Sequence, residues 1–340
     1  MTLIRWGAAL VAAALLAGGC GGRTVEPRSA GGDPYALCGP SSARSAAEDV
    51  DPVEPDAKPA LPVTVKSADG TAVTVEDTSR ILALNLYGSL AEIVFSLGLG
   101  DRVVGRDAST TFPAAAVKPL VTTQGHDLSA EAILALDPTV VLADASIGPA
   151  EVLTQLRQAG IAVVMVDDEQ TLERIDDNIT AVAKALGVPG AGRKLNERVS
   201  AQISEARKEA PAQSLRIAFL YLRGTAGVYL IGGDGAGSDA MIEAIGAQDA
   251  GTAIGLRSFR PLTSEGLINA APDVILVLSS GLESVGGIDG LLELPGVAQT
   301  PAGQNRRIVD ADDGSLLTFG ARTGSTIEAL SEAVYRECGR

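Results

Sequence analysis

Hydrophobic positions in this chain follow two alternating patterns, short apolar runs and longer stretches with helical spacing. Residues 61–75 alternate apolar and polar positions around an Asp-Gly pair, which is typical of a β-hairpin. Residues 80–84 form an apolar run, and a helix face follows at Leu90, Ile93, Val94 and Leu97. A helical stretch at residues 149–159 likewise precedes an apolar run at 161–166. Strands that alternate with helices at this spacing indicate a mostly parallel sheet covered on both faces.

The middle of the chain has a different pattern. Residues 171–210 stay helical and highly charged, with one break at residues 187–190 and one apolar stripe made of Leu172, Ile175, Ile179, Val182 and Leu186. This stretch predicts a long connecting helix, or two helices placed end to end. We therefore expect an N-terminal α/β lobe at residues 61–170 and a C-terminal α/β lobe at residues 211–340, joined by the connecting helix.

One helix-to-strand unit occurs twice. In each copy a glutamate precedes a proline by seven positions, and an apolar run follows. The two glutamates are Glu131 and Glu265, which lie 134 positions apart. Ser129 can cap the first helix, and Thr263 or Ser264 can cap the second. Two such units indicate two similar lobes rather than a solenoid, whose period is about 20–50 residues.

The N-terminus carries an export signal. Residues 1–19 have a short basic start and an apolar run that is too short for a transmembrane helix, and Cys20 follows. This segment resembles a bacterial lipoprotein signal peptide, which implies lipidation of Cys20 and anchoring at the outer face of the cell membrane. An ordinary secretory signal is the alternative, and either one exports the protein. Residues 20–60 are rich in Gly, Pro, Ser and acidic residues, and they predict a flexible tether.

Two further cysteines lie near the ends of the folded part, Cys38 and Cys338. Export makes a disulfide between them plausible, with two unpaired thiols as the alternative.

Composition excludes several classes of partner. The formal charge of −15 argues against binding nucleic acid or an anionic membrane surface. The chain has one histidine, so a multi-histidine zinc or manganese site is not expected. Apolar residues make up 46% of the 340 residues, which is ample for two packed cores.

Two places in the sequence carry candidate chemistry. His126, the single histidine, lies in a loop directly before the helix capped by Ser129, where a side chain can reach a ligand. Tyr221 and Arg223 lie two positions apart on the strand predicted at residues 216–223, so their side chains point to the same side of that strand.

Taken together, the hairpin, the helix after residue 84, the paired Glu-to-Pro units and the connecting helix resemble a substrate-binding protein of an ABC importer. The resemblance covers roughly residues 61–337. The chain resembles the class III periplasmic binding proteins in particular. Members of that class have two α/β lobes joined by a rigid helix, and they carry siderophores, cobalamin and haem. Within that class, residues 125–128 (Gly-His-Asp-Leu) and 221–224 (Tyr-Leu-Arg-Gly) resemble the haem-binding members of actinobacterial type.

This resemblance implies a monomeric carrier of haem b, not an enzyme, that delivers its ligand to an ABC permease dimer with its ATPase. Ferric haem has axial positions on both faces of a flat ring, so His126 and Tyr221 would each ligate the iron from one lobe. A hydrogen bond from the Arg223 guanidinium would stabilise the phenolate form of Tyr221.

Further residues are candidates for the pocket. Tyr229 competes with Tyr221 as a ligand, but it lacks an arginine two positions along. Phe259 can pack on the porphyrin, and Arg106 and Arg260 are candidate partners of the propionates because they are basic and near predicted cleft loops. Core packing for Tyr221 and a solvated Arg223 are the alternatives without a ligand.

The two matched glutamates have a separate expected role. In the proteins that this chain resembles, an exposed glutamate on each lobe pairs with arginines of the permease dimer, which implies docking through Glu131 and Glu265. Ordinary first-turn helix charge is the alternative.

Two rival functions stay open from the residues alone. The same scaffold could carry a ferric siderophore or a corrinoid without direct iron ligation. The glycine-rich loop at residues 232–237 predicts a turn between a strand and a helix capped by Ser238, with backbone N–H groups that can touch the ligand. The second rival is an exported enzyme or redox protein that binds a nucleotide at this loop. A Ser-His-Asp hydrolase is not expected, because His126 and Asp127 are adjacent and no Gly-x-Ser-x-Gly motif is present.

Overall fold

The computed structural model describes residues 39–45, 48–123, 125–208 and 215–335. The predicted signal peptide at residues 1–19, the lipidation site Cys20 and the cysteine pair Cys38 and Cys338 all lie outside these ranges. No helix within the described ranges combines the length and the hydrophobicity needed to cross a membrane.

The N-terminal lobe is built on a parallel sheet in the order β4-β7-β8, formed by β4 (Ile81–Leu84), β7 (Val140–Ala143) and β8 (Ala162–Met165). The predicted hairpin is present as β2 (Val63–Lys66) and β3 (Ala72–Val75), which pair antiparallel. The other elements of this lobe are α1 (Ser89–Val94), η2 (Phe95–Leu99), η3 (Gly100–Arg102), α2 (Pro113–Ala116), β5 (Thr122–Thr123), β6 (Asp127–Leu128), α3 (Ala130–Ala135) and α4 (Ala150–Gln158).

The C-terminal lobe has a larger, mixed sheet in the order β1-β14-β13-β9-β10-β12, with β11 pairing β9. Its strands are β1 (Ser41–Ala43), β9 (Arg216–Arg223), β10 (Val228–Ile231), β11 (Gln248–Asp249), β12 (Arg260–Pro261), β13 (Val274–Leu278) and β14 (Ile308–Ala311). The pairs on both sides of β13 are parallel, whereas β10 is antiparallel to β9 and to β12. Its helices are η4 (Gly224–Ala226), α7 (Ser238–Ala244), α8 (Ala250–Ala253), α9 (Ser264–Ala270), α10 (Ser279–Ser284), α11 (Gly287–Glu293), α12 (Pro301–Gln304) and α13 (Thr323–Tyr335).

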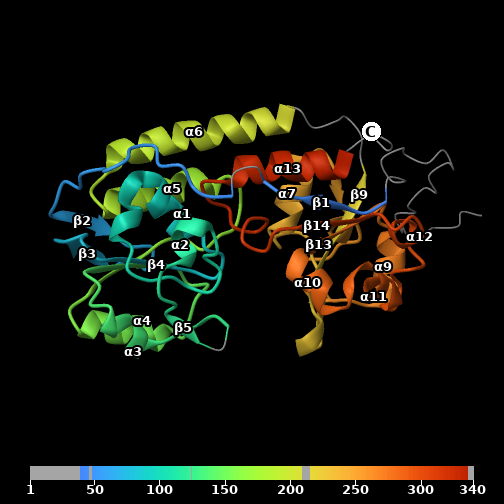
Figure 1. The fold of residues 1–340 in the computed structure, drawn as a ribbon, viewed down its shortest axis with the longest axis horizontal. Helices are drawn as coiled ribbons and strands as arrows, with labels where there is room; N and C mark the ends of the chain where they lie inside the picture. Colours follow the sequence, from blue (N-terminus) through green and yellow to red (C-terminus); the bar gives the residue numbers. More distant parts are fainter. Residues whose placement is uncertain (1–38, 46–47, 124, 209–214, 336–340) are drawn as a thin grey trace, which may run out of the picture. The chain divides into compact units, whose positions relative to one another are not determined.

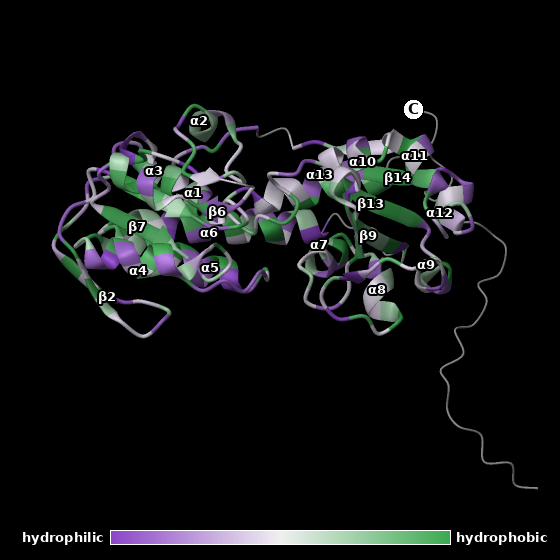
Figure 2. Cartoon of the chain, turned by 90° about the horizontal axis from the view of Figure 1, so that it is seen from below, coloured by the Kyte–Doolittle hydropathy of each residue, from purple (hydrophilic) through white to green (hydrophobic). Residues whose placement is uncertain are grey.

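Both sheets are covered on two faces, as the apolar runs predict. Along β4, Ile81 and Ala83 belong to one buried cluster, and Leu82 and Leu84 belong to another on the opposite face. The residues of β13 alternate between two clusters in the same way. Figure 2 shows β7, β13 and β14 in the hydrophobic colour, while hydrophilic positions mark α4 and α5. This arrangement confirms the predicted α/β fold class.

The connecting segment consists of two helices, α5 (Arg174–Ala185) and α6 (Pro189–Lys208), and they pack side by side rather than end to end. The chain reverses at Gly187, whose φ of +70° favours glycine and whose added Cβ would lie 2.7 Å from the backbone oxygen of Ala60. Across the pair, the Asn196 amide donates to the Asp176 carbonyl and to the Thr180 hydroxyl. The long helix α6 then runs alongside α13 of the C-terminal lobe (Figure 1).

A strand forms where the sequence predicts only a tether. Ser41–Ala43, within the predicted tether at residues 20–60, pair in parallel with β14 as strand β1. The fully buried Arg307, directly before β14, helps to hold this strand, because its guanidinium donates to the Gly39 carbonyl and the Ser41 hydroxyl, both at 2.7 Å. The same guanidinium also donates to two carbonyls near the end of α13, at Ala333 and Val334. The polar composition of this segment hides a strand that is held by hydrogen bonds.

A buried ion pair joins the two lobes. Glu92 on α1 and Arg322 directly before α13 are 2% and 11% exposed, and the guanidinium lies 2.6–2.7 Å from the nearer carboxylate oxygen. Arg322 also donates to the Gly314 carbonyl and lies 5.5 Å from the centre of the Phe112 ring. Burial raises the pKa of Glu92, and the charge and hydrogen bonds of Arg322 oppose that shift.

Candidate functional site

A cavity of about 290 Å³ contains side chains of both lobes. The N-terminal lobe supplies Leu86, Tyr87, Ser109 and His126, and the C-terminal lobe supplies Tyr221, Arg223, Leu230, Phe259, Leu278, Asp313, Leu317 and Thr318. Its lining is mostly aliphatic and aromatic with a few polar groups, which is the usual character of a small-molecule site.

His126 reaches the cavity from the turn between β5 and β6, three residues before the Ser129 cap of α3. Gly125 makes this turn with a φ of +91°. The Nδ1 atom of His126 lies 3.4 Å from the Ser109 hydroxyl oxygen, and that hydroxyl donates its proton to the Leu86 carbonyl at 2.5 Å. With its own proton directed to Leu86, the Ser109 hydroxyl is placed to accept a hydrogen bond from Nδ1–H, and the tautomer with that proton would leave the lone pair of Nε2 free to bind a metal.

The loop that carries Ser109 is fixed by a buried carboxylate. Asp107 accepts from the backbone N–H groups of Asn85, Ser109 and Thr110 at 2.8–3.0 Å. Burial raises the pKa of Asp107 to about 6 in spite of these hydrogen bonds. This network holds the end of β4 and the Ser109 loop together on one side of the cavity.

The electrostatics favour a neutral imidazole. Partial burial lowers the pKa of His126, the positive charge of Arg223 lowers it further, and the carboxylate of Asp127 opposes both. A neutral imidazole is the form that binds a metal ion.

Tyr221 and Arg223 come from the end of β9 and share one face of the strand, as predicted. The Tyr221 ring packs against Phe259 with their centres 5.9 Å apart. The prediction that Arg223 donates to the phenol oxygen is wrong for this structure, because the guanidinium carbon lies over the Tyr221 ring, 4.5 Å from its centre. Arg223 donates instead to the Leu222 carbonyl and pairs with Asp313 at 3.4 Å.

Asp313 explains the position of Arg223. Its carboxylate accepts from the backbone N–H of Ser280 at 2.9 Å and from the Ser280 hydroxyl, at the start of α10. A carboxylate held in this way presents its remaining lone pairs to the guanidinium. The aspartate thus links the loop after β14, helix α10 and the arginine next to Tyr221.

Three predicted pocket residues lie elsewhere. Tyr229 lies on β10 opposite Leu222 of β9, and its side chain packs against a core cluster on the face of the sheet away from Tyr221. Arg106 is turned toward its own loop, where it donates to the carbonyls of Asp107 and Thr110, and Arg260 is exposed on β12. Among the described residues that line the cavity, Arg223 is the only arginine or lysine.

Several lining residues were missed, although a general rule points to them. Leu278 is the last residue of β13, and Tyr87 and Asp313 lie three and two positions after the ends of β4 and β14. Ligands of open α/β sheets bind at these ends, so residues just after each predicted strand are candidates. Burial is the main cause of a raised pKa for the Tyr87 phenol, and the negative charges of Asp144 and Asp168 raise this pKa further. The phenol therefore stays neutral.

The glycine-rich loop serves packing. Gly233 lies against the backbone of Leu256, where an added Cβ would be 2.6 Å from the carbonyl oxygen, and the loop is not part of the cavity lining. The predicted cap is also wrong: Ser238 is the first residue of α7, and Gly237 occupies the cap position without a side-chain hydrogen bond. This loop therefore gives no support to the nucleotide-binding alternative.

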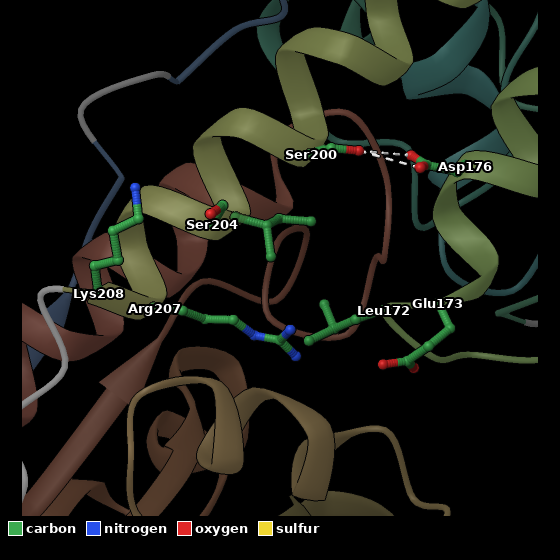
Figure 3. Close-up of a pocket in the computed structure, with 8 residues that line it drawn as sticks. Leu172, Glu173, Asp176, Ser200, Ser204, Arg207 and Lys208 are labelled. Carbon is green, nitrogen blue, oxygen red and sulfur yellow. Dashed lines mark hydrogen bonds between the residues drawn. The ribbon is translucent and has the colours of Figure 1, made fainter.

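A second cavity, of about 530 Å³, lies at α5 and α6, and Figure 3 shows its lining. Asp176 and Ser200 are hydrogen-bonded to each other there, while Arg207 and Glu173 also line it. It contains none of the predicted ligand residues, and the described residues of its lining include no aromatic side chain. We therefore take the cavity with His126 and Tyr221 as the candidate site.

Comparison with known proteins gives consistent results. Residues 85–314 match the family described as periplasmic binding protein. The crystal structure of the haem-binding protein HmuT is 45% identical, covers 90% of this chain and 100% of that one, and superposes with a TM-score of 0.85. Solved variants of HmuT replace a histidine, a tyrosine, or an arginine two positions after the tyrosine with alanine.

Two further relatives extend this picture. The periplasmic haem-binding protein RhuT from Roseiflexus sp. RS-1 is 43% identical, covers 77% of this chain and 100% of that one, and has a TM-score of 0.72. The ABC transporter substrate-binding lipoprotein YvrC of Bacillus subtilis (strain 168), described as uncharacterized, is 27% identical over 282 residues. That match covers 81% of this chain and 86% of YvrC.

Proposed function

Because this chain belongs to the periplasmic binding protein family, whose members are carriers and not enzymes, we propose that it binds haem b outside the cytoplasm. His126 and Tyr221 are the proposed axial ligands, and the haem is handed to the permease dimer of an ABC importer with its ATPase. The observation that carries this proposal is that one cavity is lined by His126 of the first lobe and Tyr221 of the second.

The chemistry of the donor set supports the proposal. A neutral imidazole with its Nε2 free and a phenol oxygen are both ligands that ferric haem accepts. Phe259 and the aliphatic residues of the lining can pack on the porphyrin, and Arg223 places a positive charge beside the Tyr221 ring. HmuT and RhuT, which are described as haem-binding proteins, share this fold and more than two fifths of the sequence.

Titration of the purified protein with hemin tests the proposal. We expect a ferric Soret band at one-to-one binding, and His126→Ala and Tyr221→Ala should each change that band and weaken binding by about tenfold or more. Tyr229→Phe is the matched control, because it removes a phenol from the neighbouring strand on the other face of the sheet. Unchanged spectra in both ligand variants would exclude axial ligation by these residues.

Two competing ligand classes belong in the same experiment. Cyanocobalamin and a ferric hydroxamate siderophore, titrated against the unliganded protein, represent the corrinoid and siderophore alternatives. Tight binding of either, with hemin binding only weakly, would reverse the choice of ligand while leaving the carrier role intact.

The cellular setting is part of the proposal. We assign residues 1–19 to a lipoprotein signal, Cys20 to the lipid anchor and residues 20–38 to a tether, with the lobes monomeric at the outer face of the membrane. The description of YvrC as a substrate-binding lipoprotein supports the anchor. Cys20→Ser should abolish incorporation of a labelled fatty acid into the protein, and label that persists in the variant would contradict lipid anchoring at Cys20.

Docking on the permease is assigned to Glu131 and Glu265. Both are exposed, and each lies in the first turn of a short helix, α3 in one lobe and α9 in the other. Matching carboxylates on two lobes suit a permease with two-fold symmetry. Glu131→Gln with Glu265→Gln should slow association with the permease most strongly at low salt.

A further inference from the structure

The helices α3 and α9 match each other residue by residue beyond the two glutamates. Each begins with a hydroxyl that accepts from the backbone N–H three residues later, Ser129 at 3.2 Å and Thr263 at 3.1 Å. Each is followed by a residue with a φ of +43°, Asp137 or Ala271, and then by a buried proline. All these pairs are 134 positions apart, so the same helical unit is built into both lobes.

Burial follows the same register. Ile133 and Leu267 occupy equivalent positions and have no exposed surface, so they fix the two helices to their lobes. The next residue in each helix points outward, and in both it is a large apolar side chain. Leu134 is 45% exposed and Ile268 is 46% exposed.

Exposure of these two side chains is unusual within this protein. Among the described residues, large hydrophobic side chains are exposed at only four positions: Val117, Leu120, Leu134 and Ile268. Single exposed apolar residues are common on protein surfaces and need no explanation. Leu134 and Ile268, however, occupy equivalent positions in the two lobes, and core packing does not require exposed apolar side chains at both positions.

Each outward residue lies three positions after a proposed docking glutamate. Residues three apart are neighbours on a helix surface, so Glu131 with Leu134, and Glu265 with Ile268, form two similar patches of one carboxylate and one aliphatic group. A second copy of this chain is a poor partner for such a patch, because its charge of −15 would bring carboxylates together. The complementary surface has a basic residue beside an apolar pocket, and it carries this pair twice.

We propose that Leu134 and Ile268 are apolar anchors that enter two symmetry-related pockets of the permease dimer, each beside the basic residue that pairs with Glu131 or Glu265. This inference rests on the proposed delivery of haem to a permease, and it divides the roles within each patch. The carboxylates guide the encounter through long-range attraction, whereas the desolvated aliphatic groups hold the complex together.

Binding of the haem-loaded protein to the permease–ATPase complex of the same organism, reconstituted in lipid nanodiscs, tests the anchors. Leu134→Ala with Ile268→Ala should weaken binding at least about tenfold, chiefly through faster dissociation, because interface substitutions act mostly on that rate. Leu134→Gln with Ile268→Gln should weaken it at least as much while keeping side chains of similar length. The matched control is Val117→Ala with Leu120→Ala, which removes the other two exposed apolar side chains and should change binding less than twofold.

The outcomes separate the anchors from the delivery proposal. If the unmodified protein binds the complex and both anchor variants bind as it does, the anchors are overturned while delivery stands. If the unmodified protein does not bind, delivery and the anchors both fall. Every variant should keep the hemin spectrum and the melting temperature of the unmodified protein, since none of the four residues lines the haem cavity. A control variant as weak as the anchor variants would also overturn the assignment, because it would show a general loss of surface hydrophobicity.

Discussion

At the residue scale, the charge on His126 is set by its surroundings, and the chain offers a direct way to measure it. It is the only histidine in the sequence, so its ring protons give isolated NMR signals. Burial and Arg223 both lower the pKa of this imidazole. We expect a titration midpoint below the ordinary value of about 6.5 in the unliganded protein.

Substitution of the arginine fixes the sign of this effect. In Arg223→Gln the repulsion between two positive charges disappears, so the midpoint of His126 should move up toward its ordinary value. Protons would then compete with iron for the His126 imidazole at a higher pH, so haem should be released at a higher pH during acidification. Arg260→Gln, which removes an exposed arginine outside the cavity, should leave the midpoint in place. A midpoint that stays put or falls in Arg223→Gln would contradict the electrostatic account.

Residue-level chemistry was predictable where it depended on local sequence. The period of a strand places Tyr221 and Arg223 on one face, and a loop before a capped helix places His126 at the edge of its lobe. The partner of Arg223 was not predictable, because Asp313 is 90 positions away and reaches it only through the order of strands β9, β13 and β14. Ser109 was hidden for the same reason: its contact with His126 depends on how one loop folds onto another.

At the element scale, the two capped helices allow a stability test with an internal control. Ser129→Ala and Thr263→Ala each remove the acceptor for an N-terminal backbone N–H, so each should lower the free energy of unfolding by about 1 kcal/mol. Ser264→Ala, one residue further along α9, should change it by less than about 0.5 kcal/mol. Urea denaturation measures all three, and equal losses for Thr263→Ala and Ser264→Ala would refute the capping assignment.

Elements differ in how clearly the sequence encodes them. The hairpin, β4, α1 and the apolar stripe of α5 follow from hydrophobic period alone, because that period decides which face is buried. The side-by-side packing of α5 and α6 does not, since both arrangements have the same period. The tight reversal at Gly187 and the hydrogen bonds that Asn196 of α6 donates to α5 stabilise the side-by-side arrangement.

At the scale of the whole molecule, the ion pair between Glu92 and Arg322 holds the lobes together. Arg322→Met leaves a buried carboxylate without its partner, so it should lower the free energy of unfolding by about 3–5 kcal/mol. Glu92→Leu combined with Arg322→Met removes both charges and should recover most of that loss. Lys208→Met removes an exposed partner of Glu205 and should cost less than about 1 kcal/mol.

The pH dependence of Arg322→Met provides an independent check. A carboxyl whose pKa is raised by burial binds protons more readily in the folded state than in the unfolded one. Without Arg322 to oppose that shift, stability should improve as the pH is lowered through the titration range of Glu92. The difference in free energy of unfolding between Arg322→Met and the unmodified protein should therefore become smaller at acidic pH. A difference that becomes larger would show that Glu92 carries no unpaired charge in the variant.

Strand β1 gives the molecule an unusual order of assembly. The first described strand pairs with the strand that the chain reaches last, and Ser42 and Asp310 are joined across 268 positions. Whether the polypeptide leaves a ribosome or is threaded through a membrane, the N-terminal end emerges first. The edge of the larger sheet must stay open until residues 308–311 arrive, so the second lobe closes only after nearly the whole polypeptide has been released.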